Sequence, residues 1–91
     1  MIENATRAAW DAVFEARKTL ARITQAADAW TDQMQPTDAA YQDALGLSGS
    51  AWAARVDSLD LIESGDATPG QIGAWLARVD EIENQARQII P

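Results

Sequence analysis

The sequence contains neither cysteine nor histidine. Without cysteine there is no disulfide, thiolate nucleophile or thiolate metal site, and without histidine there is no imidazole for acid–base catalysis. A glycine-rich phosphate loop, a nucleophile elbow and a metal-ligand spacing are missing as well. We therefore expect a protein that is not an enzyme and that holds neither a cofactor nor a metal.

Basic residues are scarce too, because seven Lys and Arg stand against 14 Asp and Glu, which gives a net charge of -7. A protein that binds the phosphate backbone of a nucleic acid needs clustered Lys and Arg. An anionic membrane surface attracts the same residues. Direct binding to nucleic acid or to a membrane is therefore not expected.

Long hydrophobic runs are also absent. No window approaches the roughly 20 apolar residues of a membrane span. The first residues lack the basic start and apolar run of a signal peptide. We expect a cytoplasmic protein, or one incorporated in a particle that assembles in the cytoplasm, such as a virion.

What the sequence does contain is a helix-forming, alanine-rich composition with 47% hydrophobic residues. Ninety-one residues suffice for a single domain, 1–91. We expect an all-α bundle of three to four helices, made of a long N-terminal helix, a short second helix and an antiparallel C-terminal helical hairpin. The expected helices span residues 3–34, 38–45, 50–64 and 69–89.

The first of these helices has the clearest pattern, because residues 3–34 contain neither glycine nor proline. Apolar residues recur there at spacings of three and four, as in packed long helices. They are Ala9, Val13, Ala16, Leu20, Ile23, Ala27, Trp30 and Met34, and Ile2, seven residues before Ala9, lies on the same seam. At about 1.5 Å per residue this helix is roughly 48 Å long, so we expect it to bend or, more readily, to project towards another subunit.

The boundaries of the middle helices rest on weaker signals. Thr37 is a plausible N-cap for residues 38–45, and Gly46 then suits a left-handed C-cap. Ser48 or Ser50 is the expected start of the third helix. These signals predict a break between two short helices.

The last helix has a stronger start signal. Gly65 is expected to end the preceding helix. Thr68 then caps the last helix, Pro69 occupies its first turn and Gln71 completes a capping box. The apolar residues that follow in heptad spacing are Ile72, Trp75, Val79, Ile82, Ala86 and Ile89.

An internal repeat links these two helices, because residues 51–60 match residues 74–83 at six positions and by similar residues at others. In each copy a Trp begins an apolar stripe, which predicts that both Trp52 and Trp75 lie in the core. Trp30 is expected there as well. Folding about the short loop then places Trp52 near Ile82, Leu59 near Trp75, and Val56 near Val79.

A candidate interaction surface lies on the first helix. Trp10 sits one position off the apolar seam and pairs with Phe14 four residues later, with Arg17 one turn beyond. Aromatic side chains often anchor interfaces. This pair is either covered by the second helix or offered to a protein partner, and the sequence favours neither alternative.

Acidic residues form a second candidate surface, which comprises Asp57, Asp60, Glu63 and Asp80. Carboxylates spaced in this way are typical of a solvated face, although they could also bind a basic partner. Arg55 and Arg78 are expected to pair with neighbouring carboxylates.

One segment resembles the repressor-type helix-turn-helix family. Residues 45–56, which begin Leu-Gly-Leu-Ser, resemble the opening of its first motif helix, and Ile62-Glu-Ser-Gly resembles the end of its recognition helix. The resemblance would imply DNA reading. The sequence departs from that family because the stretch between these pieces has no room for a turn and a second helix, and it carries Asp57 and Asp60 where DNA would be read.

Together these patterns predict a small acidic helical interaction protein. The leading hypothesis is a structural or assembly component of a larger complex, such as a phage particle or a bacterial accessory assembly, with a protein partner that is a second copy or a different chain. The alternative is an acidic inhibitor or adaptor that blocks a basic, nucleic-acid-binding surface.

Overall fold

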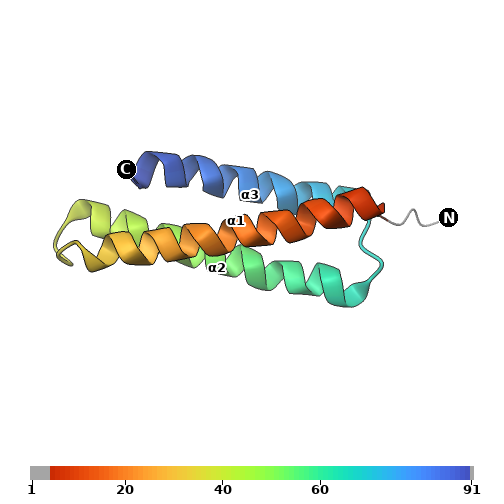
Figure 1. Cartoon of the computed structure of the whole chain (residues 1–91), viewed down its shortest axis with the longest axis horizontal. Coiled ribbons are helices and arrows are strands. Elements are labelled where there is room, and N and C mark those ends of the chain that lie inside the picture. Colours follow the sequence, from red (N-terminus) through yellow and green to blue (C-terminus); the bar gives the residue numbers. More distant parts are fainter. Residues whose placement is uncertain (1–4, 91) are drawn as a thin grey trace.

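Three helices make up the computed structural model, which describes residues 5–90. They are α1 (Arg7–Asp32), α2 (Ala39–Ser64) and α3 (Pro69–Ile89). Each helix runs in the opposite direction to the one before it, and the three lie side by side (Figure 1). No strand occurs within residues 5–90, so the all-helical prediction is confirmed.

The start of α1 is set by Thr6, whose hydroxyl accepts a hydrogen bond from the backbone N–H of Ala9. This satisfies one of the free N–H groups of the first turn. The core residues of α1 all belong to the predicted seam, and they are Val13, Leu20, Ile23 and Ala27. Trp30 is half-buried, and Ile2 lies outside the described residues.

The predicted break in the middle of the chain is wrong, because α2 is continuous from Ala39 to Ser64. Gly46 is helical and does not form a left-handed cap, and the N-cap is Asp38 in place of Thr37. A glycine inside a helix costs about 0.5–1 kcal/mol relative to alanine. Burial of Leu47 and its alanine neighbours outweighs that cost.

The face that α2 buries also differs from the prediction. Its buried residues are mostly small, namely Ala44, Leu47, Ala51, Ala54 and Ser58. Trp52, Val56 and Leu59 are 58%, 44% and 41% exposed. These exposed side chains cannot form the expected layers with α3, so the predicted two-fold packing of the repeat is wrong.

The small residues of α2 make room for large ones from its neighbours. Trp75 of α3 is buried, and its indole N–H donates to the carbonyl of Ala54 at 2.8 Å. The rest of the α3 core stripe consists of Ile72, Val79 and Ile82, all buried as predicted. The matching apolar residues of the two repeat copies therefore have different environments: Trp75, Val79 and Ile82 are buried in α3, whereas Trp52, Val56 and Leu59 are exposed on α2.

The loop between α2 and α3 follows its sequence signals. Gly65 ends α2 with a φ of 67°, a left-handed conformation that glycine adopts without a Cβ clash. The hydroxyl of Thr68 accepts from the N–H of Gln71, whose side chain accepts in return from the N–H of Thr68. This reciprocal capping box, followed by Pro69 in the first turn, confirms the predicted start of α3.

The molecule is an elongated rod of 54 × 20 × 16 Å. The predicted projection of the first helix is wrong, because α2 has the same length of 26 residues as α1 and runs beside it (Figure 1). No helix within residues 5–90 is long and apolar enough to cross a membrane.

Candidate protein-interaction face

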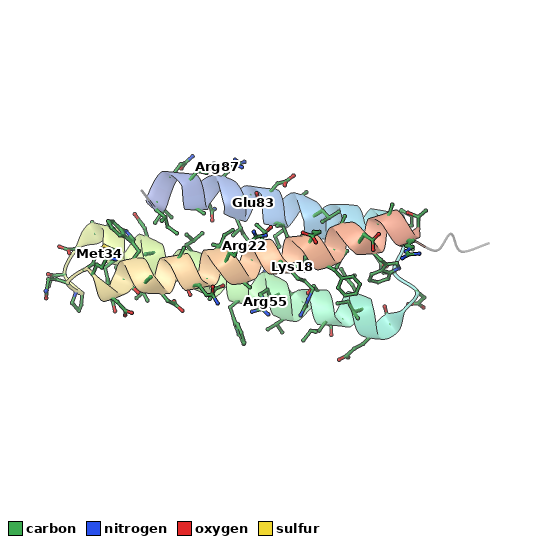
Figure 2. All side chains as sticks on the ribbon, in the orientation of Figure 1. Lys18, Arg22, Met34, Arg55, Glu83 and Arg87 are labelled. Atoms are coloured by element: carbon green, nitrogen blue, oxygen red, sulfur yellow. The ribbon has the colours of Figure 1, made fainter. Side chains whose placement is uncertain are left out.

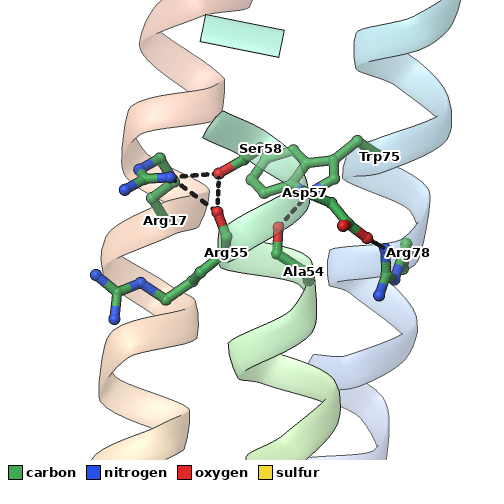
Figure 3. A network of polar contacts seen from close by, with 7 residues as sticks. All are labelled: Arg17, Ala54, Arg55, Asp57, Ser58, Trp75 and Arg78. Carbon is green, nitrogen blue, oxygen red and sulfur yellow. Dashed lines mark hydrogen bonds and ion pairs between the residues drawn. The ribbon is translucent and has the colours of Figure 1, made fainter. Parts of the chain in front are cut away.

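A polar network links α1 to α2 (Figure 3). One guanidinium nitrogen of Arg17 donates to the carbonyl of Arg55 at 3.0 Å and to the hydroxyl of Ser58. That hydroxyl in turn donates to the same carbonyl at 2.6 Å. Ser58 is fully buried, and this network satisfies its hydroxyl group.

Beside this network lies an exposed apolar surface, which we call the Trp52 face. It consists of Trp52, Val56 and Leu59 on α2, which line a common hollow, and all three are more than 40% exposed. We include Phe14 of α1, which is 48% exposed, because it lies one helical turn from Arg17, which lines the same hollow. A small hollow of about 70 Å³ lies among Trp52, Val56, Leu59 and two arginines, Arg17 and Arg55. No α3 residue lines it.

The Trp52 face lies on the side of the helix pair that α3 leaves open. Trp75 of α3 contacts α2 at Ala54. At 3.6 residues per turn, Trp52 points about 160° away from Ala54 around α2. Within residues 5–90, the groove between α1 and α2 on that side therefore has no third helix over it.

The size of this apolar surface is notable for a chain of 91 residues. A fully exposed aromatic side chain presents about 150–250 Å², so Trp52 and Phe14, at 58% and 48% exposure, together contribute roughly 200 Å². Val56 and Leu59 extend the face to a few hundred Å². The largest apolar patch on a typical monomer is about 300–600 Å² and is often functional.

The structure separates the residues that the sequence singled out on the first helix. Phe14 belongs to the Trp52 face, whereas Trp10 is half-buried and packs against the core. Arg17 is half-buried beneath the face, where it holds Ser58. Their assignment to a protein interface stays a prediction.

Two arginines, Arg17 and Arg55, border the hollow of the Trp52 face. Among residues 5–90 the ion pairs are Lys18–Glu15, Arg78–Asp57 and Arg87–Glu83. Neither Arg17 nor Arg55 has a carboxylate partner within that range. The guanidinium of Arg55 instead lies 6.0 Å from the centre of the Trp52 ring, within the range of a cation–π contact.

The pairing predicted for the arginines is therefore half right. Arg78 bonds to Asp57 and links α3 to α2 on the exposed surface. Arg55 has no such partner within residues 5–90, and its Nε is buried without a hydrogen-bond acceptor. Figure 3 shows its side chain on the α1 side of α2, directed away from α3.

The predicted acidic residues spread around the molecule. Asp57 turns towards α3, where it meets Arg78. Glu63 comes six residues later, so it points about 120° away around α2. Asp60 and Asp80 are exposed. No group of three acidic residues within residues 5–90 is arranged to hold a metal ion.

A second hollow lies between α1 and the end of α3. It has a volume of about 340 Å³ and is widely open, with a lining that is mostly apolar. Arg22 and Arg87 border it, and Figure 2 shows both arginines on the α3 side of the rod, away from Arg55. Arg87 also pairs with Glu83.

Sequence reasoning missed the Trp52 face because it assigned Trp52, Val56 and Leu59 to the core. The helix-turn-helix resemblance also fails structurally, since α2 runs without a turn through residues 45–64. No family model, curated protein or solved structure matches the chain. Its function must therefore be argued from its own surface.

Proposed function

We propose that this chain is a small, non-enzymatic helical interaction protein that binds a protein partner through the Trp52 face. The supporting observation is the exposure of Trp52, Val56 and Leu59 around one hollow between α1 and α2, with Phe14 also exposed on α1. Large apolar patches on soluble proteins commonly mark interaction sites, and aromatic residues with arginine are enriched at interface centres. A role as a structural or assembly component of a larger complex, such as a phage particle, fits this surface.

Site-specific photocrosslinking in the cells that naturally make the protein tests this proposal. A benzophenone amino acid at position 52 is expected to yield a protein adduct, whereas the same group at position 81 on α3 is expected to yield none. Leu59→Asp should abolish the adduct at position 52. Absence of any protein adduct at position 52 would contradict the proposal, as would an equal yield at both positions.

A second candidate function is an acidic inhibitor or adaptor that blocks a basic, nucleic-acid-binding surface. Its support is that Asp60, Glu63 and Asp80 are exposed and belong to no ion pair within residues 5–90. Binding through these carboxylates should weaken steeply as salt rises, since exposed charges are screened. Charge reversal at Asp60 and Glu63 should then impair binding more than Leu59→Asp does, the reverse of the order expected for the Trp52 face.

A further inference from the structure

From the same face, and resting on the function proposed above, we infer the chemistry of the partner. The open groove between α1 and α2 accepts an acidic amphipathic helix, with large apolar residues at positions i, i+4 and i+7 flanked by carboxylates. The apolar residues cover Trp52, Val56 and Leu59, and one of them enters the hollow among these side chains. The carboxylates pair with Arg17 and Arg55.

The expected helical shape of the occupant follows from the packing of α3 against the opposite side of the α1–α2 pair. There α3 places Trp75, Val79 and Ile82, spaced i, i+4 and i+7, against α1 and α2. The open groove likewise lies between two helices and is lined by side chains of α1 and α2. A hollow of about 70 Å³ suits one branched apolar side chain, which favours a helix with a discrete anchor residue.

The charge of the occupant follows from the two arginines. Arg17 and Arg55 line the hollow, and no acidic residue in the described part of the chain, 5–90, does. Covering the groove with an apolar helix alone would remove water from two guanidinium groups without supplying carboxylates, which is costly. Carboxylates on the incoming helix remove that cost, and Arg binds them with two parallel hydrogen bonds.

A second copy of this chain fits the groove less well. A two-fold contact through α2 that sets Trp52 of each copy against Leu59 of the other brings residues 55 and 56 to the axis. Arg55 of one copy then faces Arg55 of the other, with Arg17 of each close behind. Such like-charge contact opposes a symmetric dimer.

A pair of synthetic helical peptides tests this inference at 150 mM NaCl. Both carry leucine at i, i+4 and i+7 on an alanine-rich helix, and they differ only in flanking residues, glutamate in one and lysine in the other. The net charge of -7 favours the lysine peptide, whereas the groove favours the glutamate peptide. The Debye length of about 8 Å at this salt lets the local charges dominate.

We expect the glutamate peptide to bind at least about tenfold more tightly than the lysine peptide, measured by fluorescence anisotropy. This corresponds to a modest share of the coupling found for close charge pairs at interfaces. Arg55→Glu should weaken its binding by about tenfold or more. Arg7→Glu, the same charge change on an exposed residue at the start of α1, should leave binding within about twofold. In NMR spectra the indole signal of Trp52 should move, while that of the buried Trp75 stays in place.

Three results would overturn the inference: a lysine peptide that binds as well as the glutamate peptide, equal effects of Arg55→Glu and Arg7→Glu, or a stable dimer that Leu59→Asp dissociates. Light scattering on the protein without peptide detects such a dimer. The photocrosslinking experiment separates this failure from that of the proposed function. An adduct at position 52 without glutamate preference rejects the acidic helix and keeps a protein partner, whereas no adduct rejects both.

Discussion

Ser58 is a polar residue within an otherwise apolar buried set of residues 5–90. Its hydroxyl sits between the guanidinium of Arg17 and the carbonyl of Arg55. Arg17 of α1 is thereby held beside Arg55 and Ser58 of α2, because both of its hydrogen-bond acceptors belong to these two residues. At the scale of single residues, the network therefore supports the register of α1 against α2.

Variants of Ser58 and Arg17 test whether these two side chains stabilise the fold together. Ser58→Ala and Arg17→Met are each expected to lower the free energy of unfolding by about 1–2 kcal/mol, since hydrogen bonds to charged groups are stronger than neutral ones. The double variant should lose less than the sum, by at least about 0.5 kcal/mol. Urea unfolding of the four proteins measures this coupling, and strict additivity would show that the two groups act independently.

The two repeat tryptophans provide a matched test of burial. Trp75→Phe should lower the free energy of unfolding by about 1.5–3 kcal/mol, because it removes packed volume and the hydrogen bond to Ala54. Trp52→Phe should change it by less than about 0.5 kcal/mol, as is usual for exposed sites. Urea unfolding again measures both, and equal losses would contradict the different environments of the two repeats.

The same tryptophans show what the sequence could and could not predict. Apolar residues of α2 satisfy spacings of three and four on two stripes, one led by Trp52 and one composed mainly of alanines. Hydrophobicity alone favours the stripe with large side chains. The structure buries the alanines of α2 because α1 and α3 already supply large residues to the core. This match between small and large side chains depends on how the helices pack, so the sequence of α2 alone does not predict it.

At the scale of helices, alanine substitutions at the glycines within and after α2 test whether this helix is continuous. A Cβ added at Gly46 or Gly49 meets nothing within 4 Å, and both residues are helical. Gly46→Ala and Gly49→Ala should each raise the free energy of unfolding by about 0.5–1 kcal/mol. Gly65→Ala should lower it by about 1–2 kcal/mol, since that φ of 67° disfavours any residue with a Cβ.

Thermal and urea unfolding of the three glycine variants distinguish a continuous α2 from two helices. If Gly46 were a left-handed cap, as the sequence alone suggested, its replacement by alanine would destabilise the protein in the same way as that of Gly65. A rise in stability for Gly46→Ala with a fall for Gly65→Ala supports one helix from Ala39 to Ser64.

Local signals predicted helix ends well where several agreed. At the start of α3, Thr68, Pro69 and Gln71 all point to one boundary, and the structure has it there. Gly46 stood alone, and a single glycine is tolerated when tertiary contacts hold the flanking turns. Those tertiary contacts keep α2 continuous, so that it is as long as α1. The local sequence around Gly46 does not reveal them, and the sequence therefore suggested a projecting first helix.

At the scale of the whole molecule, the net charge of -7 is confined to a rod only 20 × 16 Å in cross-section. The ion pairs within residues 5–90 are all on the surface, where each contributes about 0–1 kcal/mol. At about 10 mM salt the Debye length is near 30 Å, longer than the width of the rod. Repulsion among carboxylates should therefore oppose folding more than the few ion pairs favour it.

Sodium chloride should consequently stabilise this protein. Between 10 and 300 mM, we expect the free energy of unfolding to rise by about 1 kcal/mol, a shift in Tm of about 4–8 °C for a domain of this size. The double variant Asp60→Asn, Glu63→Gln removes two exposed negative charges and should show a smaller rise with a higher Tm at low salt. A Tm that falls with added chloride would mean instead that Lys18–Glu15, Arg78–Asp57 and Arg87–Glu83 stabilise the fold more than the excess of carboxylates destabilises it.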